Sequence, residues 1–145
     1  MEKLIATSRI VFANNFTLYF KSASYHWNVE SFYFPQFHDF FGNYYADVYG
    51  AVDTLAEFIR TFDVYAPISI AELNRYTTIG DDVIKPVNVN IMVGNLLSAN
   101  SLMIQSLESA FEASQEANEQ GYANFIADRL TAHKKHQWML KSILK

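Results

Sequence analysis

Two sets of mostly apolar residues recur every seven positions through the first part of the chain. Seven residues make almost two turns of an α-helix, so each set lies along one side of a helix. The two sets are adjacent and form one broad stripe that must be buried against other elements. This stripe predicts a first helix at about residues 3–28. The sets are Ile5, Phe12, Tyr19 and His26, and Leu4, Val11, Leu18 and Tyr25.

The same apolar spacing predicts a second helix. Ser31 and Pro35 form the approach to this helix, which extends to about Phe62. A long connection follows at about 63–88. It contains two prolines and a short helical piece near "SIAELNRY".

Two further helices complete the pattern. A third helix is expected at about 89–118, and Gly121 is interpreted as the stop before a fourth helix that reaches the end of the sequence. Two long helical hairpins joined by one long crossover predict an all-α fold, a ferritin-like four-helix bundle whose crossover carries a short helix. We expect residues 1–145 to form a single domain.

Composition narrows the class of protein. Hydrophobic residues make up 50% of the chain and charged residues 18%, which is typical of a packed globular fold. There is no cysteine, which excludes disulfides and thiolate metal sites and fits a reducing cytoplasm. The sequence has no run of about 18 apolar residues and no signal-peptide pattern, so we expect a cytoplasmic protein without a membrane span. A net charge of −4 gives no general attraction for nucleic acid.

Ordinary di-iron bundles bind metal between their helices through two Glu-x-x-His pairs. No Glu of this chain is followed three positions later by His, so that centre is not encoded. The second predicted helix instead places His38, Asp53 and Glu57 on one face, at roughly 0°, 60° and 100° around its axis. However, His38 and Asp53 are about 22 Å apart along the helix, whereas ligands lie roughly 2–2.6 Å from their ion. One copy of the helix cannot form the site.

Two copies of this helix related by a two-fold axis can form it. If they pack antiparallel with the axis near Asp47 and Val48, His38 of one copy faces the Asp53–Glu57 region of the other. Such a contact creates two identical sites per dimer.

His26, at the end of the first helix, is a candidate for the second imidazole. Imidazole and carboxylate ligands suit iron, zinc or manganese better than calcium or magnesium. The alternative stays open that His26 is a hydrogen-bonded core residue and that Asp53 and Glu57 form a solvated or salt-bridged face near Arg60.

His133 and His136 have no carboxylate partner at metal spacing in the sequence, and we interpret them as structural or surface residues.

The stretch "YHWNVESFYFPQFHDFFGNYYADVYGAVDTLAEFIR" resembles the signature region of the Dps family, the mini-ferritins known as DNA-binding proteins from starved cells. The pattern is His-Trp-Asn-Val, a second His twelve residues after the first, and then Asp-x-x-Ala-Glu. The segment "HKKHQWML" is also similar to that family's last helix, and the resemblance covers essentially the whole chain.

The resemblance implies a dodecameric hollow shell that oxidises Fe(II), usually with hydrogen peroxide and otherwise with oxygen, and stores the ferric mineral in its cavity. It also implies that His26 and His38 of one subunit, with Asp53 and Glu57 of its partner, are the iron ligands and the ferroxidase residues.

The sequence departs from the family pattern in three places. The family usually has an acidic residue four positions after its second histidine, where this chain has Gly42. Glu30-Ser31 replaces the usual glycine after the His-Trp motif. DNA-binding members often have a basic tail, but the N-terminus here offers only Lys3 and Arg9.

These departures leave two alternatives to an iron-oxidising shell. The first is a shell with impaired oxidation that serves as a scaffold or a DNA-protecting cover. The second is a dimeric helical interaction module without metal.

Overall fold

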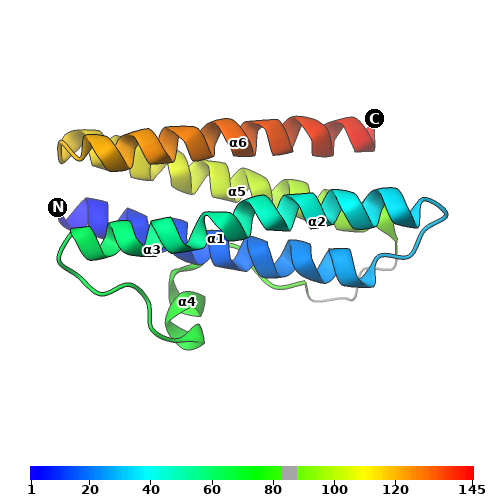
Figure 1. Cartoon of the computed structure of the whole chain (residues 1–145), viewed down its shortest axis with the longest axis horizontal. Helices are drawn as coiled ribbons and strands as arrows, with labels where there is room; N and C mark the ends of the chain where they lie inside the picture. The colour runs from blue at the N-terminus through cyan, green and yellow to red at the C-terminus, as the bar shows by residue number, and fades with distance from the viewer. Residues whose placement is uncertain (83–87) are drawn as a thin grey trace.

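The computed structural model describes residues 1–82 and 88–145, and it is helical with connecting turns over that range (Figure 1). Residues 83–87 of the predicted connection, with Pro86, lie outside the described residues. Within the described ranges, no helix is long and apolar enough to cross a membrane. The helices are α1 (Glu2–Asn28), α2 (Phe34–Gly50), α3 (Val52–Thr61), α4 (Ile70–Tyr76), α5 (Val89–Glu116) and α6 (Gln120–Leu144).

The long helices form two hairpins. α1 packs beside α2 and α3, and α5 packs beside α6 (Figure 1). α1 also packs along α5, which joins the hairpins into one four-helix bundle. α4 lies outside the bundle, against α1, in the crossover between the hairpins. The predicted bundle, with a short helix in a long crossover, is confirmed.

The second long helix is interrupted, which corrects the prediction of one continuous helix to Phe62. α2 ends at Gly50 and α3 begins at Val52, with Ala51 between them at φ −88° and ψ −12°. The Ala51 N–H donates to the Val48 carbonyl at 3.2 Å, so this turn is tighter than an α-helical turn. Gly50 favours such a break because glycine is a poor helix former.

The turn between α5 and α6 depends on Asn118 and not on Gly121. Asn118 has a φ of 59°, in the left-handed region that asparagine tolerates. The Glu119 N–H donates to the Ser114 carbonyl at 2.9 Å and the Asn118 N–H to the Gln115 carbonyl at 3.1 Å, which is the bond pair of a Schellman helix end. Gly121 lies inside the first turn of α6, so the predicted glycine stop is wrong.

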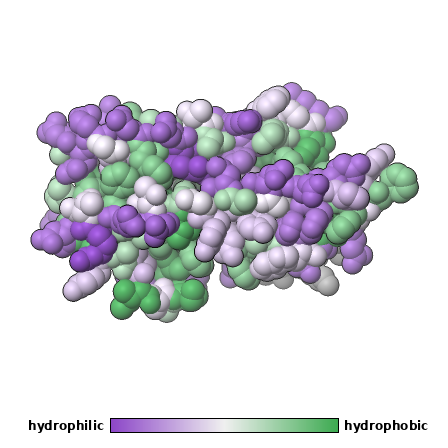
Figure 2. Space-filling model, in the orientation of Figure 1, coloured by the Kyte–Doolittle hydropathy of each residue, from purple (hydrophilic) through white to green (hydrophobic). Residues whose placement is uncertain are grey.

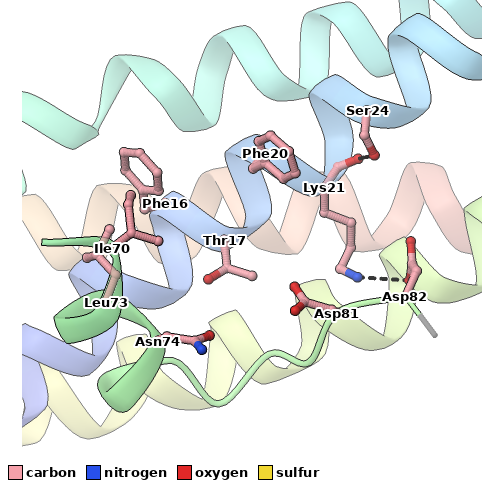
Figure 3. Close-up of a pocket in the computed structure, with 10 residues that line it drawn as sticks. All are labelled: Phe16, Thr17, Phe20, Lys21, Ser24, Ile70, Leu73, Asn74, Asp81 and Asp82. Carbon is pink, nitrogen blue, oxygen red and sulfur yellow. Dashed lines mark hydrogen bonds and ion pairs between the residues drawn. The ribbon is translucent and has the colours of Figure 1, made fainter.

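Buried polar contacts hold the crossover on α1. Lys21 is buried and donates to Asp82 at 2.9 Å, and the Tyr25 hydroxyl donates to the same carboxylate at 2.6 Å. Asn14 accepts a hydrogen bond from the Thr78 N–H at 2.8 Å. Figure 3 shows the Lys21–Asp82 pair at one side of a pocket lined by α1, α4 and the segment after α4. These contacts fix the path of the chain from α4 back along α1.

Candidate metal site

His26 and His38 face each other across the hairpin of α1 and α2. His26 lies in the last turn of α1, and His38 lies early in α2. Their imidazole rings stack with centroids 3.7 Å apart and planes 15° apart. His26 Nδ1 donates to the backbone carbonyl of His38 at 2.6 Å, and His38 Nδ1 donates to that of His26 at 2.7 Å. Each histidine therefore anchors the ring of the other.

These bonds determine which ring nitrogen carries the proton. A carbonyl oxygen can only accept a hydrogen bond, so each Nδ1 must be the donor. In a neutral imidazole the other nitrogen, Nε2, then keeps its lone pair. Metal-binding histidines have this arrangement, in which one ring nitrogen donates to a carbonyl or carboxylate and the other binds the ion. The pair thus offers two Nε2 atoms as ligands.

Aromatic side chains surround the histidine pair. Phe34 stacks on His38 with ring centroids 5.0 Å apart, and Tyr45 meets His26 edge-on at 5.2 Å. Both histidines are only half-buried, and Trp27 is 59% exposed. A surface that covered these rings would exclude water from the two imidazoles.

Asp53 and Glu57 lie apart from the histidines, on α3. Both side chains are exposed, and within the described residues they form no ion pair. Arg60, the partner considered for them, instead donates to the Val64 carbonyl at 2.9 Å and lies over the Tyr65 ring. In the part of the chain that the structure describes, no three His, Asp or Glu side chains gather around one possible ion position. One chain does not bring the four candidate ligands together, and the two-chain site stays a prediction.

A largely buried polar cluster, in which Asp47 is half-buried, joins α2 to α6. Asp47 accepts two hydrogen bonds from Arg129, at 3.1 and 2.9 Å, and one from His136 Nε2 at 2.8 Å. The bond from His136, and then those from Arg129, hold the pKa of the Asp47 carboxyl well below its usual range. In the sequence, His133 and His136 have no carboxylate at metal spacing, and the structure pairs His136 with the distant Asp47 through a hydrogen bond. Both histidines are buried, which makes them structural and not surface residues.

His133 belongs to the same cluster. Its Nδ1 donates to Asn100 Oδ1 at 2.8 Å, and the Tyr44 hydroxyl donates to that oxygen at 2.8 Å. Burial lowers the pKa of His133 well below its ordinary value, and the nearby Arg129 charge adds to this effect. The spacing of Arg129, His133 and His136 does indicate one face of α6. The sequence alone could not show that Asp47 of α2 points toward that face.

Comparison with known proteins places the chain in a family. The family model of the ferritin-like domain matches residues 10–145. Antigen TpF1 of Treponema pallidum is 32% identical over 132 residues, which cover 88% of this chain and 72% of that protein. The DNA protection during starvation protein of Brevibacillus brevis is 26% identical over 133 residues, 92% of this chain and 89% of that protein. The chain belongs to the Dps family of ferritin-like proteins.

The fold of this Dps protein agrees with a solved member of the family. The crystal structure of Dps from Staphylococcus aureus matches it with a TM-score of 0.94, over 100% of this chain and 97% of that chain, at 24% identity.

Proposed function

We propose that this Dps protein oxidises Fe(II) in the cytoplasm at sites shared by two subunits, and that it stores the ferric product inside a hollow shell of about twelve subunits. Fe(II) is the substrate, and hydrogen peroxide or oxygen is the oxidant. His26 and His38 of one subunit, with Asp53 and Glu57 of the partner subunit, bind the iron. The observation that carries the proposal is the reciprocal hydrogen bonding of the two histidines, which leaves both Nε2 atoms free for a metal.

The ligand set fits the chemistry of the substrate. Two imidazoles and two carboxylates suit iron, and zinc or manganese would bind to the same donors. The carboxylates also favour oxidation, because negative ligands stabilise Fe(III) more than Fe(II). Each Fe(II) loses one electron, so two Fe(II) ions and two protons convert one hydrogen peroxide into two water molecules.

Exposed apolar side chains support assembly into a larger particle. Tyr65, Ile68 and Ile70, at and just before α4, are 75%, 86% and 71% exposed. Figure 2 shows hydrophobic surface gathered over the α4 region and at the end of the bundle where α1 turns into α2. Apolar patches of this kind on an isolated chain mark protein–protein contacts.

Anaerobic addition of Fe(II) and hydrogen peroxide tests the proposal, with ferric absorbance as the readout. We expect the parent protein to form Fe(III) rapidly. If twelve subunits of 16.6 kDa assemble, the particle should elute at about 200 kDa. The double variant His38→Ala, Glu57→Ala should lose this activity at unchanged particle size. Asp128→Ala is the control, because it removes an exposed carboxylate of α6. A double variant as fast as the parent would show that the site is wrongly assigned.

The second candidate is a shell with impaired oxidation that acts as a scaffold or DNA-protecting cover. Gly42 favours this reading, because the resemblance leads one to expect a carboxylate at that position. A parent shell that oxidises iron no faster than the double variant would favour it. DNA binding is then tested by gel shift, and a shift that disappears at modest salt would indicate non-specific contact only.

A further inference from the structure

The Arg129 guanidinium of α6 lies among three side chains that are able to bind a metal ion. Its Nη1 and Nη2 donate to the two carboxylate oxygens of Asp47, at 3.1 and 2.9 Å. Nη2 also lies 3.4 Å from His133 Nε2, and His136 Nε2 is 2.8 Å from the Asp47 oxygen that Nη2 contacts. Two imidazoles and one carboxylate therefore meet beside one positively charged group that the chain itself supplies.

His133 directs a lone pair at this guanidinium. The Asn100 side-chain N–H donates to the backbone carbonyl of His133 at 3.0 Å, so the amide oxygen is the atom that faces His133 Nδ1 at 2.8 Å. His133 Nδ1 must then carry the ring proton, and in the neutral ring Nε2 keeps its lone pair. A metal-binding histidine has the same arrangement, with one ring nitrogen donating to an oxygen and the other directed at a cation. The cation here is Arg129.

The imidazoles of His133 and His136 are arranged so that both can reach one ion. Their ring planes are inclined by 68°, with centroids 5.4 Å apart. An imidazole binds metal through a lone pair in the plane of its ring, so two inclined planes can direct both lone pairs at one point. Ligands at roughly 2.0–2.2 Å from a tetrahedral ion lie about 3.3–3.6 Å from one another. His136 Nε2 and the Asp47 oxygen would therefore have to separate by less than about 1 Å.

Arg129 closes this cluster to metal in the chain as it stands. Within the described residues, no three His, Asp or Glu side chains surround a possible ion position. In this cluster the reason is that Nη2 lies between the Asp47 carboxylate and the His133 ring. The Asp47 side chain is 36% exposed, so an ion from solvent could reach the carboxylate if the guanidinium were absent.

We propose that Arg129 is the built-in cation of a latent metal site and keeps divalent metal out of the space between α2 and α6. Without the guanidinium, Asp47, His133 and His136 form a two-histidine, one-carboxylate set with an open position, a combination that binds Fe(II) and Zn²⁺. With the guanidinium in place, its charge is paired with Asp47 and repels a second cation. The inference does not depend on the proposed function, because all of these residues belong to one chain.

Zinc binding to Arg129→Ala tests the proposal, because Zn²⁺ takes these ligands and undergoes no redox reaction. Equilibrium dialysis counts the zinc ions on the parent and on the variant, and zinc bound at other sites cancels in the difference. We expect about one additional zinc per subunit in Arg129→Ala. A folded Arg129→Ala variant that binds no more zinc than the parent would overturn the proposal.

Two further variants separate the site from a general effect of the substitution. Arg129→Ala, His133→Ala lacks one ligand and should lose the additional zinc. Arg129→Lys keeps a positive charge at the same position and should bind zinc like the parent. An additional ion in Arg129→Lys would mean that the charge does not keep metal out, and an additional ion in the double variant would mean that zinc binds elsewhere. Either result would overturn the proposal.

The test also decides if Arg129→Ala is unfolded without metal. An ion that binds only the folded chain stabilises it, so zinc should restore the helical circular dichroism of Arg129→Ala but not of the double variant. No recovery with zinc would contradict the proposal. The parent protein gives a second measurement, since His136→Ala should bind as much zinc as the parent if Arg129 already excludes metal. Loss of one zinc per subunit on that substitution would show that the parent binds metal in the cluster, against the proposal.

Discussion

Asp47 and His133 belong to one polar cluster, in which Asp47 is charged and His133 is neutral. Asp47 is charged, because Arg129 and His136 both donate to it. His133 is neutral, because it is fully buried, its Nδ1 proton is used on Asn100, and the Arg129 guanidinium lies 3.4 Å from its Nε2. The groups that face His133 are thus Asn100 of α5, Asp47 and Tyr44 of α2, and Arg129 and His136 of α6.

The neutral state of His133 predicts a loss of stability on mild acidification. The folded-state pKa of His133 is lowered, so below its ordinary value of about 6.5 the unfolded chain binds a proton that the folded chain does not. The free energy of unfolding should therefore fall as pH decreases from about 7 toward 5, with a contribution of up to about 1.4 kcal/mol per pH unit from this residue.

Urea unfolding midpoints at several pH values measure this effect. His133→Gln keeps a hydrogen-bonding side chain but removes the titrating group, so its midpoint should depend less on pH between about 5 and 7 than that of the parent. An unchanged pH dependence would mean that another group causes it. The contribution of Asp47 to the free energy of unfolding changes only at lower pH. Because the pKa of Asp47 is lowered, its stabilisation is present above about pH 4 and is lost as pH falls further.

At the scale of the element, one side of α2 packs into the bundle and another side faces the end of α1. Tyr44 and Val48 point into the bundle, and the half-buried Asp47 beside them is bonded to α6. His38 and Gly42, four residues apart, lie on the side that faces His26 at the end of α1. The predicted two-fold axis at the level of Asp47 and Val48 would therefore cross the opposite face of α2, away from these inward side chains.

Gly50, the last residue of α2, gives a test at this scale. It is exposed, and an added Cβ atom would meet nothing within 4 Å in one chain. Gly50→Ala should therefore stabilise the protein by about 0.5–1 kcal/mol, because alanine loses less backbone entropy in a helix than glycine. Thermal unfolding of the variant measures this. A lower midpoint, or a smaller particle, would instead place Gly50 in a close contact between subunits.

The sequence predicted those features that depend on local spacing. The heptad stripe of α1 and the apolar pattern of α5 indicated both helices within a few residues, because a buried stripe must follow the helical period. The interruption at Ala51 was missed, since it depends on one tightened turn that leaves the stripe intact. The bond between His136 and Asp47 was missed because the two residues are 89 positions apart. Only the relative rotation of α2 and α6 brings them together.

At the scale of the whole molecule, the candidate ligands divide into two incomplete sets. The histidine pair lies at the end of the α1–α2 hairpin, and the carboxylate pair lies on α3, near the other end of the bundle (Figure 1). Within the described residues, each set lacks enough ligands to hold an ion by itself. Under the proposed function, an unassembled chain has no oxidation site, and activity begins only when two subunits meet.

This division predicts that two inactive variants can restore activity together. His38→Ala chains lack the imidazole, and Glu57→Ala chains lack the carboxylate, so shells made of either chain alone should oxidise Fe(II) slowly. In shells from equal co-expression, about half of the dimers are mixed, and each mixed dimer has one intact site and one doubly altered site. The mixed shells should recover about a quarter of the parental sites, measured by Fe(II) oxidation and by zinc binding. If they stay as inactive as the single variants, both ligands of each site come from the same chain.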